Sequence, residues 1–174
     1  MIAILQPLIP HYRKDFFNGL QNKIDADIYQ YYKKADEEKN FSKSTIITKQ
    51  IGSISIGSFL LYNPFVLLKS KYTYLVLPLH IGHITTWFLL FTRGIHRKKI
   101  ILWGHGISIK RYTKEETKPS KLLKWMIKRS YGCWFYTVNE LNVWRKELPN
   151  INAVALSNTL SDIEKRLEIS NLPN

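Results

Sequence analysis

The sequence predicts an α/β protein with a Rossmann-like parallel sheet and helices on both faces. Short apolar runs that do not alternate with polar residues recur along the chain, and segments with helical periodicity separate them. Strands that are buried on both faces have this pattern, and their alternation with helices is typical of a parallel sheet. With 174 residues, 45% of them hydrophobic, the chain fits one domain with a substantial core.

The first part of the chain begins with a strand and a helix. Ile2–Leu5 is a short apolar run, and two nearby prolines restrict the following backbone to a rigid turn. A helix over Tyr12–Asn22 is expected because its apolar residues recur at helical spacing. The aromatic segment Asp27–Tyr32 favours a second strand, and the charged stretch 33–43 indicates a loop. Further extended segments are expected at 45–51, 53–56 and 59–62.

The middle of the chain contains an uncharged stretch, Tyr72–Thr92, which is long enough to span a bilayer. A proline, a glycine and two histidines interrupt it between residues 78 and 83. We therefore expect a strand at Tyr74–Leu77, a turn, and a buried helix from about 81 to 91. A proline in a first helical turn also favours a short helix over 63–69.

The last part of the chain continues the alternation of strands and helices. Gly104, His105 and Gly106 directly follow an expected strand, and a polar loop comes after them. The remaining strands are expected at 100–103, 133–136 and 151–156. The remaining helices are expected at 119–131, 139–146 and 162–169.

Charge and cysteine content limit the possible functions. The net charge is +13, and residues 45–137 hold the whole excess, with fifteen basic and two acidic side chains. Such a surface attracts the phosphates of nucleic acid, of anionic lipid or of a phosphorylated substrate. Cys133 is the single cysteine, so an internal disulfide and a closed zinc site are excluded, and a reducing, cytosolic compartment is expected. The N-terminus lacks the features of a signal peptide.

The helix expected over 119–131 has a basic face. Its apolar side consists of Leu122, Leu123, Met126 and Ile127. Its basic side consists of Lys118, Lys121, Lys124, Lys128 and Arg129, with Trp125 among them. A basic face with an embedded tryptophan is typical of a helix at a membrane surface, and an ordinary solvated face is the alternative.

Three candidate sites follow the carboxyl ends of expected strands, where ligands bind in open α/β sheets. The first is Pro10, His11, Tyr12 and Arg13, which could present an imidazole and a guanidinium to a phosphate or to sugar hydroxyls. A solvated helix N-terminus is the alternative. The sequence contains no G-x-G-x-x-G, no Walker A pattern and no G-x-S-x-G.

The second candidate site is the pair His80 and His83. Two histidines at this spacing could ligate a metal, but no third ligand is evident, so polar contacts in a cleft or helix capping are favoured. The third is Gly104-His105-Gly106, with Lys110 and Arg111 shortly after it. Its glycines allow a sharp turn or close approach of a ligand, and a turn with an incidental histidine is the alternative.

A family resemblance covers nearly the whole chain. Near the N-terminus, its residues are Pro7, Pro10, Tyr12, Arg13, Phe16, Phe17 and Leu20. The later segments that carry it are Leu102–Gly106, Phe135–Thr137 and Ser157–Thr159. In this order, these segments resemble the N-terminal half of family 4-like glycosyltransferases with the GT-B fold.

The resemblance implies a role in sugar transfer. In such enzymes the N-terminal half binds a glycan or lipid-linked acceptor, the C-terminal half binds the nucleotide sugar, and usually no metal takes part. It implies that 1–160 is the acceptor-binding domain and that 161–174 is a terminal helix or the start of an interdomain linker. His105 matches a cleft histidine that helps to position acceptor or sugar, and is the predicted catalytic residue. The loop 10–13 matches the loop that faces the donor's phosphates.

Two departures from the family pattern limit what the resemblance implies. The first loop lacks the glycine pair of many members, and neither a second sheet nor a Glu-x7-Glu motif is present. We therefore expect the chain by itself to transfer no sugar. The expected location is the cytoplasm, at the inner face of the plasma membrane. The alternatives are a basic nucleic-acid-binding domain and a stand-alone adaptor for a separate donor-domain chain.

Overall fold

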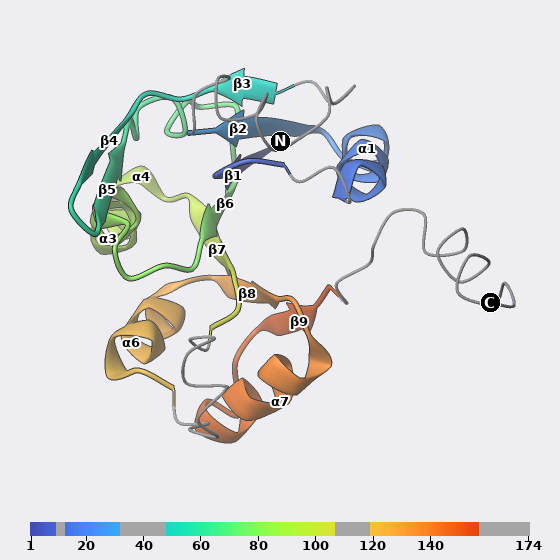
Figure 1. The fold of residues 1–174 in the computed structure, drawn as a ribbon, viewed down its shortest axis with the longest axis vertical. Helices are drawn as coiled ribbons and strands as arrows, with labels where there is room; N and C mark the ends of the chain where they lie inside the picture. The colour runs from blue at the N-terminus through green and yellow to red at the C-terminus, as the bar shows by residue number, and fades with distance from the viewer. Residues whose placement is uncertain (10–12, 32–47, 107–118, 157–174) are drawn as a thin grey trace, which may run out of the picture.

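The computed structural model describes residues 1–9, 13–31, 48–106 and 119–156 (Figure 1). Their main feature is a seven-stranded parallel sheet with the order β3-β2-β1-β6-β7-β8-β9. The strands are β1 (Ile2–Gln6), β2 (Ala26–Gln30), β3 (Thr48–Gln50), β6 (Tyr74–Pro78), β7 (Lys99–Trp103), β8 (Gly132–Phe135) and β9 (Ala153–Ala155). This confirms the predicted Rossmann-like α/β class.

The order of the strands reverses between β1 and β6. From β1 the chain adds β2 and β3 on one side, and then returns to place β6 on the other side of β1. Ile4 is therefore in register with Ile28 of β2 and with Val76 of β6. In open parallel sheets such a reversal leaves a crevice at the carboxyl ends of the strands, where ligands bind.

Helices cover both faces of the sheet. On one face Leu5, Leu77 and Leu102 pack in a core that also includes residues of α3 (Ile84–Phe91), α6 (Lys121–Arg129) and α7 (Val138–Glu147). On the other face Ile4, Val76 and Trp103 pack against α1 (Lys14–Lys23). Alternate residues of one strand thus serve opposite cores, as the pleat of a strand requires. Figure 1 shows α1 on the opposite side of the strands from α3.

A two-stranded antiparallel hairpin, β4 (Ser53–Ile56) and β5 (Phe59–Tyr62), lies beside α3 (Figure 1). The sequence predicted these two segments as extended. The hairpin is fixed to α3, because the backbone N–H of Tyr62 donates to Oγ1 of Thr85 and this hydroxyl donates to the carbonyl of Tyr62, both at 2.9 Å. The Tyr62 and Thr86 hydroxyls are also bonded, at 2.8 Å.

Several predicted boundaries differ from the structure. The helix predicted over 63–69 is wrong: the amides of Leu67 and Leu68 both donate to the carbonyl of Pro64, which closes a single turn and no helix. The helix predicted from 81 begins at Ile84, because the amide of His83 bonds the carbonyl of His80 in a turn. The helix predicted to 131 ends at Arg129. The predicted helix over 162–169 lies outside the described residues.

A half-buried carboxylate joins β2, β3 and the segment before β6 at the amino edge of the sheet. Asp27 accepts hydrogen bonds from Lys49 (2.7 Å), Lys71 (2.6 Å) and Tyr72. The Tyr72 hydroxyl is also bonded to the Tyr29 hydroxyl, at 2.7 Å. Burial alone would raise the pKa of Asp27, but the three donors outweigh it and hold this pKa well below its usual range.

Replacement of Asp27 by asparagine is therefore expected to destabilise the fold. Asp27→Asn removes the charge that both lysines and Tyr72 face, so we expect a loss of about 2 kcal/mol in the free energy of unfolding. Urea unfolding followed by circular dichroism measures this loss. Asp25→Asn, at an exposed position, is the control, with an expected change within about 0.5 kcal/mol. Equal losses in both variants would contradict this role of Asp27.

Candidate functional site

A pocket of about 560 Å³ lies at the carboxyl edge of the sheet, beside the strand reversal. Gln6 ends β1, Pro78 ends β6 and Trp103 ends β7, and all three line the pocket. Tyr136, which follows β8, closes another side. Its wall is largely aromatic and apolar with a few polar groups, which is typical of small-molecule sites.

The pocket brings two of the three predicted sites together. The second, His80 and His83, and the third, Gly104, His105 and Gly106, all line it. They come from the turns after β6 and β7, which are adjacent parallel strands. Five other predicted site residues lie outside the described residues: Pro10, His11, Tyr12, Lys110 and Arg111.

His105 is held by a carboxylate that the sequence analysis did not identify. Its Nδ1 lies 2.9 Å from Oε1 of Glu140, which is buried in the first turn of α7. The imidazole also packs on Tyr136, with 4.3 Å between the ring centres. About half of the His105 side chain (47%) is exposed. Glu140 therefore fixes the imidazole while the ring stays accessible from the pocket.

Glu140 is itself held by the helix cap of α7. The Thr137 hydroxyl accepts from the backbone N–H of Glu140 at 3.2 Å, and Oε2 of Glu140 accepts from the backbone N–H of Thr137 at 3.1 Å. This is a capping box, which the pattern Thr-x-x-Glu signals in a sequence. The pattern at 137–140 could thus have identified Glu140 as a buried, fixed carboxylate.

The His105–Glu140 pair resembles a base with its orienting carboxylate. An ionised carboxylate only accepts hydrogen bonds, so Nδ1 of His105 is the donor in this bond, and in a neutral imidazole the lone pair then lies on Nε2. Such a ring can accept a hydrogen bond from a hydroxyl, or take up its proton while the carboxylate stabilises the imidazolium. The arrangement suits a ligand with hydroxyl groups.

Gly104 permits a close approach between the turns after β6 and β7. A Cβ at this position would lie 2.9 Å from Cβ of Leu79 and 3.1 Å from its carbonyl oxygen. The amide of Leu79 donates to the carbonyl of Trp103 at 2.8 Å, which holds the two turns together. The sequence predicted that this glycine allows a sharp turn or the close approach of a ligand, and in the structure it allows the close approach of Leu79.

Two buried polar atoms in the pocket wall have no hydrogen-bond partner within the part of the chain that the structure describes. They are Nδ1 of His83 and the indole N–H of Trp103. Both atoms are enclosed within the wall, so a ligand in the pocket would bond them only if neighbouring side chains shift. Burial, together with nearby His80, lowers the pKa of His83 to about 4, so this imidazole is neutral near pH 7.

The lowered pKa of His83 predicts a pH-dependent stability. Unfolding returns the pKa of His83 to its ordinary value of about 6.5. Between pH 6.5 and 4 the unfolded chain therefore binds a proton at His83 that the folded chain does not bind. The free energy of unfolding should fall by about 2 kcal/mol between pH 7 and pH 5. Urea titrations at both pH values measure this, and His83→Gln should reduce the fall. The same fall in both proteins would contradict the assignment.

Arg13, of the first predicted site, lies at the same edge of the sheet. It is buried, and its guanidinium carbon lies 4.4 Å from the ring centre of Tyr136 and 5.8 Å from that of Trp103. Its charge therefore lies beside two aromatic side chains of the pocket wall. The sequence predicted a guanidinium presented at a helix start, and the structure places it against these rings.

The basic helix α6 differs from its predicted helical wheel in two positions. Leu122, predicted on the apolar side, is 53% exposed. Trp125, predicted among the basic residues, stacks on Trp87 and Phe91 of α3, at 5.2 and 4.7 Å between ring centres. The helix is rotated so that Met126 and Ile127 are buried and the tryptophan packs on α3. Lys121 and Lys128 are exposed, Lys124 pairs with Glu147 at 2.9 Å, and Lys118 lies outside the described residues.

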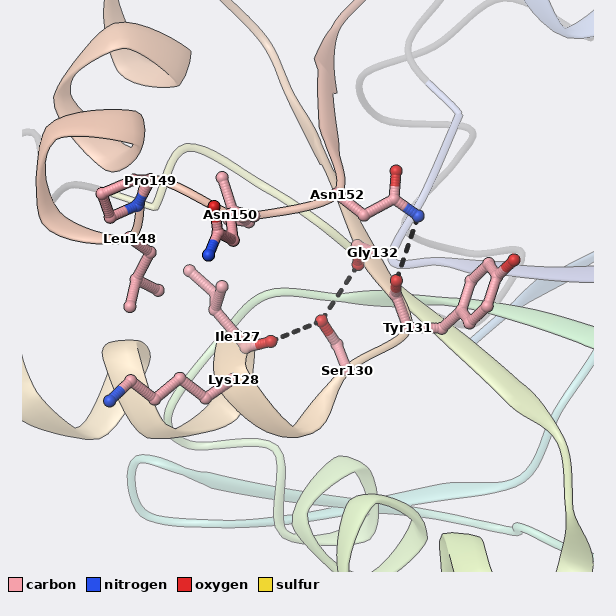
Figure 2. Close-up of a pocket in the computed structure, with 10 residues that line it drawn as sticks. Ile127, Lys128, Ser130, Tyr131, Gly132, Leu148, Pro149, Asn150 and Asn152 are labelled. Atoms are coloured by element: carbon pink, nitrogen blue, oxygen red, sulfur yellow. Dashed lines mark hydrogen bonds between the residues drawn. The ribbon is translucent and has the colours of Figure 1, made fainter.

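A second pocket of about 380 Å³ lies near the start of β8, between α6 and the loop after α7 (Figure 2). Two of its polar side chains, Ser130 and Asn152, are already bonded within the chain. The Ser130 hydroxyl bonds the carbonyls of Ile127 and Gly132, and the Asn152 side chain donates to the carbonyl of Tyr131 (Figure 2). Because these groups stabilise the turn before β8, the carboxyl-edge pocket is the better candidate for function.

Neither a metal centre nor a spanning helix is found in the described ranges. No cluster of three or more His, Cys, Asp or Glu side chains there could hold a metal ion. The helices in these ranges are all too short or too polar to cross a bilayer.

Comparison of the chain with protein-family models, with curated proteins and with solved structures found no match. The class of the protein is therefore assigned from its strand order and its pocket. It is a Rossmann-like α/β protein with a candidate ligand site at the carboxyl edge of its sheet.

Proposed function

We propose that this chain is the acceptor-binding domain of a glycosyltransferase of the hexosyltransferase type. Its acceptor would be a glycan or a lipid-linked saccharide at the inner face of the plasma membrane. A nucleotide-sugar donor would be bound by a second domain or by a separate chain. The observation that supports this most is the His105–Glu140 pair in a largely aromatic pocket at the strand reversal.

The pocket offers complementary groups for a sugar ring. Tyr136 provides aromatic surface against which the C–H face of a hexose can pack, and the buried rings of Trp103 and Tyr31 form the wall behind it. Nε2 of His105, whose side chain is half exposed, would accept from one hydroxyl. His105 would thereby orient the acceptor hydroxyl toward the donor sugar.

Nucleic-acid binding is less well supported. That function needs aromatic side chains free to stack on bases beside the basic residues. Trp125, the aromatic residue of the basic helix, instead packs between α6 and α3, and the exposed Phe88 and Phe91 of α3 lie in a stripe with the aliphatic side chains Ile84 and Ile95. Acceptor binding therefore remains the proposal.

Isothermal titration with four probes tests the proposal. The probes are a short-chain prenyl diphosphate hexose, a neutral oligosaccharide, a uridine diphosphate hexose and a DNA duplex. We expect one of the two acceptor analogues to bind, and His105→Ala to weaken this binding at least about fivefold through the lost hydrogen bond. His96→Ala, outside the pocket, is the control. Preference for the nucleotide sugar or for DNA would overturn the proposal.

A further inference from the structure

A stripe of apolar side chains is exposed along α3 and α4 (Arg93–His96). Ile84, Phe88, Phe91 and Ile95 recur at intervals of four, three and four residues, which places them on one side of a helix. All four are exposed, Phe91 by 59% and Ile95 by 83%. Large apolar side chains that are grouped in this way on a surface mark an interaction site.

The opposite side of α3 is already in the core. Thr85, Thr86, Leu89 and Leu90 are buried, and residues 84–92 contain no charged side chain. A helix that is apolar on every side is normally covered on every side. Within the described ranges, the outer side of α3 is left open to solvent.

The hairpin beside α3 carries a second exposed apolar surface. Ile54 pairs with Leu61 and Ile56 with Phe59, and all four side chains are exposed. Because Tyr62 and Thr85 bond the hairpin to α3, the two apolar surfaces move as one unit.

Basic side chains border the stripe. The guanidinium carbon of Arg129 on α6 lies 5.8 Å from the ring centre of Phe91 and 4.8 Å from that of Trp125. Arg93 donates to the carbonyl of Arg129 at 2.6 Å, which ties α4 to the end of α6. Arg97 and Lys128 are also exposed. No Asp or Glu occurs in residues 48–106 or 119–137, so no acidic side chain of these ranges offsets this charge.

We propose that α3, α4, the outer face of the hairpin and the basic side of α6 form one face that docks on an anionic lipid bilayer. The apolar stripe would enter the boundary between headgroups and acyl chains, and the arginines and lysines would bind lipid phosphates. A second copy of the chain would place two strongly positive faces against each other, so the charge favours the bilayer as the occupant.

The docking face also borders the candidate pocket. Leu123 of α6 and His83, which directly precedes α3, both line the pocket. A lipid-linked acceptor could therefore reach the pocket from the docked membrane. This last step rests on the proposed function, whereas the docking itself does not.

Vesicle flotation tests the docking without any acceptor. The probes are vesicles of phosphatidylcholine alone and of phosphatidylcholine with phosphatidylglycerol. We expect the chain to float with the anionic vesicles and high salt to weaken this binding. Phe88→Ser with Ile95→Ser, and separately Lys121→Glu with Lys128→Glu, should each reduce the partition coefficient about tenfold or more.

Matched variants elsewhere on the surface provide the controls. Val138→Ser with Val154→Ser removes two exposed apolar side chains from α7 and β9, and Arg145→Glu with Lys146→Glu reverses the same number of charges on α7. Both should bind the anionic vesicles nearly as the wild type does. Quenching of tryptophan fluorescence by brominated lipid, from Trp87 and Trp125, provides a readout in the wild type that needs no variant.

Three results would overturn the docking proposal. The first is binding that is the same for neutral and anionic vesicles. The second is equal loss in the test and control variants. The third is the absence of both flotation and tryptophan quenching. If the wild type instead self-associates, and the double variant Phe88→Ser with Ile95→Ser abolishes this self-association, the apolar stripe binds a second copy of the chain and not a bilayer. Because no vesicle contains a saccharide, these results are independent of the proposed acceptor-binding function.

Discussion

Replacing Gly106 by alanine is expected to lower the free energy of unfolding by about 3 kcal/mol. Gly106 has φ +65°, a left-handed conformation that costs other residues about 1–2 kcal/mol. A Cβ here would also clash with the indole nitrogen of Trp144 and lie 2.8 Å from the ring of Phe135. These two rings are buried and stack with 6.1 Å between centres, so neither can move without opening the core.

Gly94→Ala is the matched control for this variant. Gly94 lies in α4, and a Cβ there would meet nothing within 4 Å. Because alanine is the better helix former, we expect Gly94→Ala to be neutral or to stabilise by up to about 1 kcal/mol. Urea unfolding of both variants gives the comparison. A Gly106→Ala variant that is as stable as the wild type would show that the turn after β7 is not fixed as described.

Replacing Glu140 by alanine is expected to be nearly as costly and to affect the site as well. The variant removes half of the capping box and leaves the Thr137 amide and His105 Nδ1 without their acceptor. Loss of a cap costs about 1 kcal/mol, and loss of a buried hydrogen-bond acceptor costs about 1–3 kcal/mol. We expect a total loss of about 2–3 kcal/mol in the free energy of unfolding, together with weaker acceptor binding.

Two further variants separate the cap from the site. Glu140→Gln keeps one oxygen for the Thr137 amide, while its NH2 group replaces the oxygen that faces Nδ1 of His105, so the cap is kept and the variant should cost about 1 kcal/mol or less in stability. Because this NH2 group only donates, Nδ1 of His105 would have to accept and the proton would lie on Nε2, so acceptor binding should still weaken. Glu147→Ala removes an exposed ion pair with Lys124 at the other end of α7 and should change stability by less than about 1 kcal/mol. If Glu147→Ala lowers the free energy of unfolding as much as Glu140→Ala does, the role of Glu140 in capping α7 and holding His105 is contradicted.

The parallel sheet could be predicted because its strands are buried on both faces. Runs such as Ile100–Trp103 have no polar alternation, and helical periodicity separates them. The meeting of His80, His83 and His105 in one pocket also follows from this pattern, since adjacent parallel strands end at the same edge. The short helix over 63–69 could not be excluded, because a proline in a first helical turn also fits a single turn.

Two features of the structure depend on tertiary contacts, which the periodicity of the sequence cannot predict. Glu140 reads as a surface residue of an ordinary helix unless its cap with Thr137 is recognised, and only the folded chain brings it to His105. The orientation of α6 depends on its packing against α3, where Trp87 and Phe91 bind Trp125 more favourably than solvent would. A helical wheel of α6 alone therefore points its tryptophan outward.

The central claim is that the pocket at the carboxyl edge binds a saccharide acceptor. The most direct test is a nuclear magnetic resonance titration of the ¹⁵N-labelled chain with the short-chain prenyl diphosphate hexose. We predict saturable shifts of the Trp103 indole N–H and of the His83 and His105 imidazoles, while the Asn152 amide in the second pocket stays unchanged. Shifts confined to the second pocket or to α3, with none at Trp103, His83 or His105, would contradict the account.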